Sequence, residues 1–343
     1  MRRQGKPEPA SQPQGEHMDH LGIDLSKAYF DVTLLSATGD KAQSHFENNA
    51  SGFKALSHWL KAQGVSQVQA CMEATNIYWE KLAQDLYEQG HTVYVVNPAR
   101  IKGHAMSQLR RSKTDQVDGA VIADFCRSQR DLRAWTPPNP EQRKLRNLVR
   151  HRADLLTLVV QQKNRLADCQ DDELKAAWQR LLDTCTSEIE TVEQQLEQHL
   201  AHHPALQETY SLLRSVKGLG PVACWTLMAE MPDLADYENA AAAAADAGVT
   251  PAHHESGDTV RRKPKMSKVG KATIRSVLYF PALTAMRFNP IIRTFAERLE
   301  KQGKHKMAII VAVMRKLIHL AYGVLKHKMP FDPNFGSSPQ PPT

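Results

Sequence analysis

The sequence predicts an α/β plus all-α protein, in which a mixed sheet with helices comes first and helical segments follow. Three apolar segments with β-branched residues open the folded part. Helical and strand patterns then alternate, and beyond about residue 140 apolar residues recur only at helical spacing. A three-strand meander followed by alternating helices and strands implies a mixed sheet covered by helices. We therefore expect a sheet domain at 19–138, a helical hairpin or coiled coil at 139–203 and a mainly helical domain at 204–331.

The two ends of the chain have the composition of unfolded segments. Residues 1–18 are rich in Pro, Gln, Gly and charge, and residues 332–343 are rich in Pro, Ser and Gly. Segments of this kind bury too little apolar surface to offset the entropy lost on ordering, so we expect disordered tails at both ends.

The elements of the sheet domain follow from local patterns. Apolar or alternating runs bounded by turn residues predict strands, and apolar residues three and four apart predict helices, the first of them capped by Ser51. The predicted strands are 21–25, 30–35, 41–48, 68–72 and 91–96, and the predicted helices begin at Ser51 and cover 76–89 and 114–127.

Two long helical patterns follow the sheet domain. Apolar residues recur at helical spacing from Leu145 to Leu166, and after a polar break at Asp171 the pattern resumes as far as Leu200. The segment is either an internal spacer or an oligomerisation arm. The length of its helices, greater than a small core needs, favours the arm.

The C-terminal segment combines helices with a polar, glycine-bearing loop at 253–271. Before the loop, Gly218 and Gly220 form a Gly-x-Gly turn between helices. Such a turn either brings backbone amides close to a phosphate or lets two helices pack closely, and the turn alone favours neither. The predicted helices in this segment cover 240–245, 274–286 and 307–326.

Charge is distributed in blocks along the chain, although the net charge is only +7. Residues 100–165 contain 15 Lys and Arg against 6 Asp and Glu, residues 166–257 contain 4 against 16, and residues 258–328 contain 17 against 3. A single charge run is ordinarily a solvated helix face. A basic block as long as the last one favours binding to a nucleic acid, with an anionic membrane surface as the lesser alternative.

Cysteine usage and hydropathy limit the compartment. The five cysteines form no Cys-x-x-Cys pair, which argues against a disulfide framework and a zinc site and fits a reducing compartment. The N-terminus lacks the apolar core of a signal peptide, and no apolar run approaches 18 residues. We therefore expect a soluble intracellular protein with no membrane partner.

Four acidic residues occupy positions that suit a metal site. Asp24 lies inside the first predicted strand, Glu73 follows the fourth, and Asp115 and Asp118 are three apart at the start of a helix. Each alone could be a solvent-facing residue or a helix cap. If the two strands are neighbours and the helix crosses them, the four carboxylates converge and need Mg²⁺ or Mn²⁺ between them. Two such ions suit phosphodiester exchange, because they activate the attacking oxygen and stabilise the leaving one.

At these residues the chain resembles the DEDD transposases of bacterial insertion sequences, a family related to the Piv DNA invertase. The resemblance extends over about residues 20–328 and rests on short pieces in a shared order and spacing. These pieces are 22–27 (GIDLSK), 72–75 (MEAT), 111–123 (RSKTDQVDGAVIA), 218–221 (GLGP), 255–257 (ESG), 267–271 (SKVGK) and 274–275 (IR).

The resemblance implies an RNase H-like (RuvC-like) catalytic domain in which Asp24, Glu73, Asp115 and Asp118 bind the metal. It implies that Ser256 is a nucleophile that becomes covalently joined to DNA. It also implies a structured bridge RNA as guide, and dimers or tetramers in which the serine of one subunit meets the carboxylates of another. The cell location implied is the bacterial cytoplasm, in association with the nucleoid.

Ser256 would not be assigned a catalytic role from its residue type alone. A serine hydroxyl needs a base or a metal to act as a nucleophile, and a loop serine is ordinarily structural. Whether His253 or His254 assists it stays open. Basic residues of the C-terminal loop are expected to hold phosphate backbone by charge rather than read bases. The expected nucleic-acid contacts are Lys113, Gly218, Gly220, Lys268, Lys271 and Arg275.

These observations favour a transposase or site-specific recombinase that cuts and rejoins DNA. A RuvC-type nuclease or junction resolvase that uses water shares the carboxylates but needs no serine, and a covalent protein–DNA adduct separates the two. A non-catalytic nucleic-acid binder explains only the basic blocks. It predicts that Asp24→Ala or Asp115→Ala leaves function intact.

Overall fold

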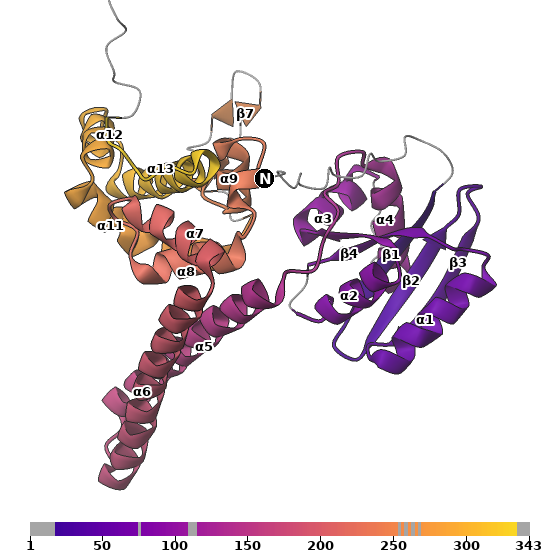
Figure 1. Cartoon of the computed structure of the whole chain (residues 1–343), viewed down its shortest axis with the longest axis horizontal. Coiled ribbons are helices and arrows are strands. Elements are labelled where there is room, and N and C mark those ends of the chain that lie inside the picture. Colours follow the sequence, from indigo (N-terminus) through magenta and orange to yellow (C-terminus); the bar gives the residue numbers. More distant parts are fainter. Residues whose placement is uncertain are drawn as a thin grey trace, which may run out of the picture. The chain divides into compact units, whose positions relative to one another are not determined.

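The computed structural model describes residues 18–74, 77–108, 115–252, 255–256, 260–261, 265–266 and 269–334, without the side chains of 115–118 and 251–266. The contacts of the chain divide it into two compact units, 1–137 and 138–343, and each is described by itself (Figure 1). Lys113, Lys268, His253, His254 and nearly all of both terminal tails lie outside the described residues.

The first unit is built on a five-stranded mixed sheet in the order β3-β2-β1-β4-β5. Strands β1 to β3 form the antiparallel meander, and β4 and β5 run parallel to β1. The predicted mixed sheet is therefore confirmed, and it agrees with an RNase H-like domain. Its strands are β1 (Asp19–Leu25), β2 (Tyr29–Leu35), β3 (Lys41–Glu47), β4 (Val68–Glu73) and β5 (Thr92–Val96).

Helices cover both faces of this sheet, as the alternation of buried side chains requires (Figure 1). Leu21, Ile23 and Met72 pack against α1 (Ala50–Ala62) and α2 (Glu80–Glu88). On the other face, Cys71, Tyr94 and Val96 pack in a smaller core with α3 (Pro98–Ser107) and α4 (Asp115–Ser128). Strands β4 and β5 therefore present successive residues to two different cores.

The second unit begins with a long antiparallel helical hairpin, α5 (Pro140–Asp168) and α6 (Asp172–His202). The Asn139 side chain caps α5 and the Asp171 side chain caps α6. A small core of Val159, Leu182 and Cys185 holds the middle of the arm. At the other end, the leucines Leu145, Leu196 and Leu200 join the core of the C-terminal helices, so the hairpin and those helices share one core.

The C-terminal helices pack around α13 (Lys306–His327), whose residues Val313, Leu317, Ile318 and Ala321 are fully buried. Among the described helices, α13 is the one long and apolar enough to cross a membrane. It contacts α7, α9, α11 and α12 as the core helix of this unit. The other elements are α7 (Pro204–Ser215), α8 (Pro221–Glu230), η1 (Leu234–Asp236), α9 (Ala240–Asp246), α10 (Ala272–Val277), α11 (Tyr279–Phe288) and α12 (Pro290–Lys301).

Several local predictions were wrong. The cap of α1 is Asn49 and not Ser51, because the Asn49 side chain accepts hydrogen bonds from the amides of Ser51 and Gly52. Helices α3 and α12 were not predicted, although each begins with Pro after an Asn cap. The helix predicted at 274–286 is two helices that meet at Leu278.

Candidate active site

Asp24 and Glu73 lie side by side at the ends of two neighbouring parallel strands. The last residue pair in the register between β1 and β4 is Ile23 with Met72, and Asp24 and Glu73 each follow that pair by one residue. The predicted adjacency of strands one and four is therefore confirmed.

Both residues fall on the sheet face that α4 covers. Ile23 and Met72 belong to the core under α1 and α2, whereas Cys71 belongs to the core under α3 and α4. Because successive residues of a strand alternate between faces, Asp24 and Glu73 share the α4 face with Cys71. The two carboxyl groups thus belong to one face and one end of the sheet.

Helix α4 approaches that face unusually closely at Gly22. A Cβ added at Gly22 would lie 2.1 Å from the Gly119 carbonyl oxygen and 2.3 Å from the Ala123 backbone nitrogen. Farther along α4, the Cys126 thiol donates to the carbonyl oxygen of Gln69 at 3.7 Å. Gln69 lies at the start of β4, so α4 runs antiparallel to β1 and β4.

This direction sends the first turn of α4 to the end of the sheet at which Asp24 and Glu73 lie. Asp115 begins the helix, and Asp118 directly precedes Gly119. The side chains of both aspartates lie outside the described residues. The backbone therefore brings the four predicted positions to one sheet edge, while a metal-binding group of three or more side chains is not found among the described residues alone.

A further carboxylate, which the sequence analysis did not single out, lies across from Asp24. Asp31 pairs with Asp24 in the antiparallel register of β1 and β2. Its Oδ1 lies 2.9 Å from Nδ1 of His45 on β3, and the His45 ring stacks on Tyr29 with centroids 5.0 Å apart. The alternation of β2 was the available signal, since it places Asp31 and Thr33 on one face.

The position of α4 is fixed on its outer side by a hydrogen-bond cluster around Asp124. His104 Nε2 on α3 lies 3.0 Å from Oδ2 of Asp124, Arg127 donates to Oδ1 at 2.7 Å, and Gln108 donates to the same carboxylate. Partial burial alone would raise the pKa of Asp124, but these hydrogen bonds lower it to about 2. The cluster ties α3 to the helix that carries Asp115 and Asp118.

Ser256 lies in the second unit, in a segment of short paired strands where the sequence predicted a loop. β6 (Pro251–Ala252) pairs with β9 (Lys265–Met266), and between them in sequence β7 (Glu255–Ser256) pairs with β8 (Val260–Arg261). Ser256 is opposite Val260 in this register. Its side chain lies outside the described residues, so the contacts of the Ser256 hydroxyl are not described.

The base of this segment is held against the end of α9. Gly270 has a φ of +117°, and a Cβ there would lie 2.5 Å from the Asp246 carbonyl oxygen. The Lys271 amide donates to that same oxygen at 3.0 Å, and Tyr237 Oη donates to the Asp246 carboxylate at 2.6 Å. Only glycine fits this close approach in a left-handed conformation.

Two of the predicted nucleic-acid contacts take part in the same anchoring. Lys271 Nζ donates to the Glu230 carbonyl oxygen at 2.6 Å, and Arg275 donates to the Gly270 carbonyl oxygen at 3.1 Å. Burial alone would raise the pKa of Glu230, but the hydrogen bonds and charge of Arg150 lower it, with help from Lys271. Lys271 and Arg275 thus have internal structural partners.

The two glycines of the turn between α7 and α8 differ in surroundings. Gly218 has a φ of +114°, and its added Cβ would lie 2.6 Å from the Ala285 Cβ, so this glycine permits close packing against α11. Gly220 has open space around the same position. It is the N-cap of α8 and offers no side-chain hydrogen bond there. The turn thus serves close helix packing at Gly218, and the phosphate contact at Gly220 stays a prediction.

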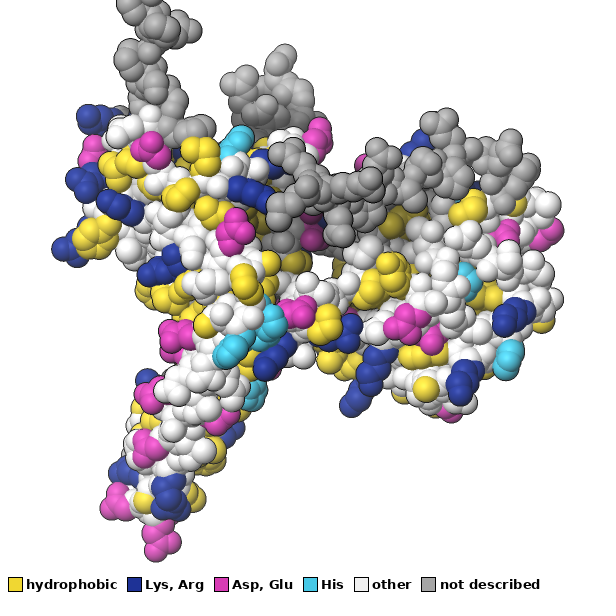
Figure 2. Space-filling view, viewed as in Figure 1, with side chains coloured by type: hydrophobic (Ala, Val, Ile, Leu, Met, Phe, Trp, Pro, Cys, Tyr) yellow, Lys and Arg dark blue, Asp and Glu magenta, His cyan; other side chains and the backbone are white. Residues whose placement is uncertain are grey.

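Basic side chains gather over α11 and α12 on the face drawn in Figure 2. Exposed residues of these two helices include Arg287, Arg293, Arg298 and Lys301, against two exposed carboxylates of α12, Glu297 and Glu300. The arm formed by α5 and α6 shows basic and acidic side chains mixed along its length (Figure 2). The basic surface at α11 and α12 is therefore the described part of the C-terminal basic block best suited to a polyanion.

Two family models match the chain. Residues 21–173 match the model of DEDD transposases of IS110 elements, and residues 210–297 match the model described as transposase IS116/IS110/IS902 family.

Three relatives cover nearly all of the chain. The pilin gene-inverting protein of Moraxella lacunata is 30% identical over 324 residues, which are 91% of this chain and 97% of the relative. The protein of the same name from Moraxella bovis is 29% identical over 323 residues, with the same coverage. An uncharacterized 44.8 kDa protein of insertion element IS116 from Streptomyces clavuligerus is 21% identical over 396 residues, covering 91% of this chain and 96% of that protein.

Proposed function

The chain belongs to the IS110 family of DEDD transposases, and on that premise we propose that it cuts and rejoins DNA with four carboxylates and one serine. Asp24, Glu73, Asp115 and Asp118 bind divalent metal, and Ser256 forms a covalent bond with DNA. The observation that carries this proposal is the antiparallel course of α4 over β1 and β4, which directs its first turn to the sheet edge of Asp24 and Glu73.

The donor set fits a hard cation. Two carboxylates at adjacent strand ends, with two more positions in the helix turn directed at them, would repel one another strongly without a counter-charge. Carboxylate oxygens are the preferred ligands of Mg²⁺ and Mn²⁺. Bound there, the metal would polarise a phosphodiester and lower the charge of the site. The role of the protein is to hold the carboxylate oxygens in the positions that bind the metal.

Ser256 acts on the DNA phosphate in this proposal. Its Oγ forms a bond to phosphorus while the bond from phosphorus to the 3′ oxygen breaks. The serine proton leaves to solvent or to a neighbouring base, and the departing 3′ oxygen takes up a proton. The products are a serine-linked 5′-phosphate and a free 3′-hydroxyl, and attack by the 3′-hydroxyl of another strand reverses the linkage and completes strand exchange.

Rejoining by this route conserves the phosphodiester energy, as recombination requires. The names of the two Moraxella relatives state that they invert a pilin gene, and an inversion needs four strands to be cut and rejoined without loss. We assign this chain to the same class of reaction. The anchoring of the Ser256 segment through Gly270, Asp246 and Lys271 supports a role in which its position matters.

Guidance by a structured bridge RNA and assembly into dimers or tetramers belong to the same proposal. The arm exposes large apolar side chains on both helices, among them Leu158 and Val160 on α5 and Leu174 and Leu181 on α6. An exposed apolar row of this length suits helix pairing between subunits. Basic residues over α11 and α12 suit RNA or DNA backbone.

The experiment is capture of the covalent intermediate in cells. The chain is expressed from a plasmid that carries its reading frame with the flanking DNA, and DNA that stays with the protein in denaturing detergent is measured. The adduct is expected in the wild type and in the control variant Ser211→Ala, which changes an exposed serine on α7. It is expected to disappear in Ser256→Ala and Asp24→Asn.

Two outcomes contradict the proposal in different ways. An adduct that persists in Ser256→Ala shows that another group is the nucleophile. DNA cleavage that depends on Asp24 but never yields an adduct shows a nuclease that uses water. RNA that co-purifies with the wild type and is encoded beside the reading frame is the expected result for guidance.

A further inference from the structure

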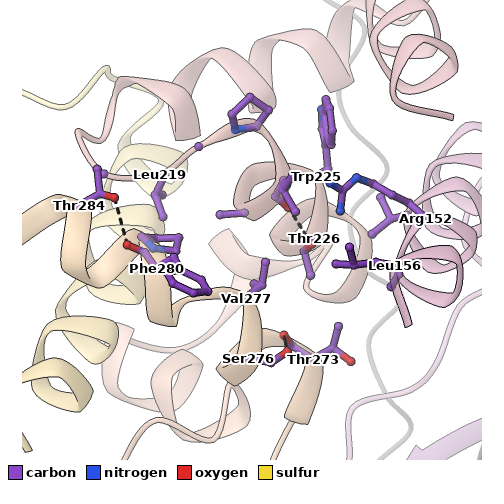
Figure 3. A pocket seen from close by; sticks show the side chains of 18 of the residues that line it. Arg152, Leu156, Leu219, Trp225, Thr226, Thr273, Ser276, Val277, Phe280 and Thr284 are labelled. Carbon is purple, nitrogen blue, oxygen red and sulfur yellow. Dashed lines mark hydrogen bonds between the residues drawn. The ribbon is translucent and has the colours of Figure 1, made fainter. Parts of the chain in front are cut away.

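The second unit contains a cavity that the proposed chemistry does not use. It has a volume of about 760 Å³ and lies between α5, the turn from α7 to α8, α8 itself, and helices α10 and α11. Figure 3 shows labelled side chains around one central space, with Arg152 and Leu156 from α5 opposite Phe280 from α11. The size falls within the range of about 300–1,000 Å³ that is typical of small-ligand sites.

The described walls of the cavity combine apolar side chains with Ser and Thr hydroxyls, and the charged side chains among them are positive. Leu156, Val277 and Phe280 supply apolar wall, and among the described residues Arg152 and Arg214 are the charged ones that line it. Arg152 is also paired with Glu193 at 2.6 Å, and Arg214 donates to the Leu219 carbonyl oxygen at 2.5 Å. Each guanidinium has five N–H donors, so one such contact leaves donors for a ligand.

The N-terminus of α8 opens on the same cavity. Gly220 caps the helix without a side-chain hydrogen bond, and Val222 and Ala223, the first residues of α8 that carry an amide proton, line the cavity. Amides at the start of a helix favour an anion such as phosphate. A Cβ at Gly220 would meet nothing within 4 Å, so there is open space beside the residue that caps this helix.

A second, independent feature of the wall is Trp225. Its side chain is 3% exposed, it lines the cavity, and its indole Nε1 is a buried donor with no hydrogen-bond partner among the described residues. A buried donor without a partner costs free energy unless an acceptor reaches it. The wall thus offers an unused donor next to an anion-binding helix end.

Phe280 supplies the flat surface at the cavity. Its side chain is 72% exposed although it lines the cavity, and it packs edge-on against Tyr279 with centroids 5.4 Å apart. An aromatic ring held in this way beside cationic groups is the usual element on which an unpaired base stacks. A duplex has no free base face to present to such a ring.

We propose that this cavity binds one unpaired nucleotide of a single-stranded nucleic acid. The base stacks on Phe280, and its phosphate is held by the α8 amides and Arg214. Recognition is expected to be tolerant of sequence, because stacking on an aromatic ring and contact with a phosphate are available to every nucleotide. The proposal rests on the proposed function in that it names the strand form that this recombinase holds.

The test is direct binding in the presence of EDTA, so that catalysis plays no part. Fluorescently labelled 12-mers of dT and of rU, and a 12-base-pair duplex, are titrated with the full chain. Phe280→Ala is expected to weaken binding of both single strands by about 5- to 150-fold, the range for loss of one stacked base, and to leave duplex binding within about twofold.

The matched control is Leu283→Ala, which removes an exposed apolar side chain from the same helix but outside the cavity. It is expected to leave single-strand binding within about twofold. A 12-mer with one 5-iodouracil should cross-link on irradiation to the peptide that contains Phe280 or to the one that contains Trp225. Because both side chains are exposed, neither substitution is expected to lower the thermal midpoint by more than about 2 °C.

Three outcomes overturn the proposal. One is equal single-strand affinity of wild type and Phe280→Ala, and another is an equal loss in Leu283→Ala. The third is a change in the oligomeric state of Phe280→Ala without a change in single-strand affinity, which would make the cavity a protein interface. Because the assay needs no metal, Asp24→Asn should bind single strands normally, so a failure of the proposed chemistry is distinguishable from a failure of this inference.

Discussion

Asp24 and Glu73 each follow, by one residue, the last register pair of two parallel strands, Ile23 with Met72. The two residues also share the sheet face on which α4 lies. Together with the direction of α4, these relationships place the two carboxyl groups next to its first turn. Four predictions concern this edge, the helix above it and the segment that carries Ser256.

Asp24→Asn and Glu73→Gln should abolish DNA strand cleavage while the chain stays folded. Loss of metal-supported charge stabilisation is worth several kcal/mol, so the rate of adduct formation should fall by at least about a thousandfold. The rate is measured in a time course of covalent adduct with Mg²⁺ present. Glu88→Gln, an exposed carboxylate at the end of α2, should behave as wild type, and a tenfold or smaller effect of Asp24→Asn would contradict the assignment.

Gly22→Ala should be far more disruptive than Gly103→Ala. At Gly22 the new Cβ meets backbone atoms of α4 at 2.1 and 2.3 Å, whereas at Gly103 it meets nothing within 4 Å. We expect Gly22→Ala to destabilise the sheet unit by about 3 kcal/mol or more through overpacking. Gly103→Ala, inside helix α3, should stabilise it by about 0.5–1 kcal/mol.

Urea unfolding followed by circular dichroism measures both glycine variants. Similar stabilities for Gly22→Ala and Gly103→Ala would show that α4 does not approach β1 as closely as described. The position of Asp115 and Asp118 at the sheet edge would then lose its main support.

Asp124→Asn should remove stability at neutral pH but not in acid. Hydrogen bonds from His104 and Arg127 lower the pKa of Asp124 to about 2 in the folded protein, from an ordinary value near 4. A lowered pKa means that the contribution is present above about pH 4 and is lost as the pH falls toward 2. With its partial exposure taken into account, the contribution is about 1–2 kcal/mol.

The free energies of unfolding of wild type and Asp124→Asn are compared from pH 7 to pH 3. The difference in free energy of unfolding between the two proteins should be constant down to about pH 5 and should become smaller below that pH. A difference in free energy of unfolding that grows in acid would mean that folding stabilises the protonated form of the Asp124 carboxyl group.

Gly270→Ala should slow adduct formation without affecting the carboxylate site. The left-handed backbone and the 2.5 Å approach to the Asp246 carbonyl oxygen leave no room for a Cβ, so the base of the Ser256 segment must shift. The control is Gly303→Ala, because Gly303 also has a positive φ, +73°, but a Cβ added there would meet nothing within 4 Å. It isolates the general cost of a left-handed alanine, about 1 kcal/mol.

Adduct yield and Mn²⁺ affinity are measured for both of these variants. Gly270→Ala should lose at least about tenfold in yield with unchanged Mn²⁺ affinity, and Gly303→Ala should change neither. Equal yields would show that the anchoring at Gly270 has no part in placing Ser256.

The sheet and its strand order could be predicted because short runs with apolar and β-branched residues, such as the largely buried run of β2, leave a clear pattern. Helix α3 could not be predicted, because Ile101 is its one buried residue, and a single apolar position shows no helical periodicity. The cap of α1 was assigned to Ser51 because Ser and Asn are equally good caps. Only the hydrogen bonds of Asn49 distinguish them.

The candidate site was only partly accessible from the sequence. Acidic residue types at strand ends and a helix start suggested a metal site, but the direction of α4 depends on the contact of Gly22 with Gly119, which spacing does not reveal. Asp31 and His45 were missed because their pairing requires the register of three strands. The cavity beside Phe280 was missed because segments around residues 152, 220 and 280 form it.

Metal binding by Asp24, Glu73, Asp115 and Asp118 is tested most directly by anomalous diffraction from a crystal of the full chain soaked with Mn²⁺. We predict an anomalous peak at the ends of β1 and β4, with oxygen atoms of Asp24, Glu73 and at least one aspartate of α4 within about 2.0–2.6 Å. A well-ordered site that holds no ion, with Asp115 and Asp118 directed away from Asp24, would contradict it.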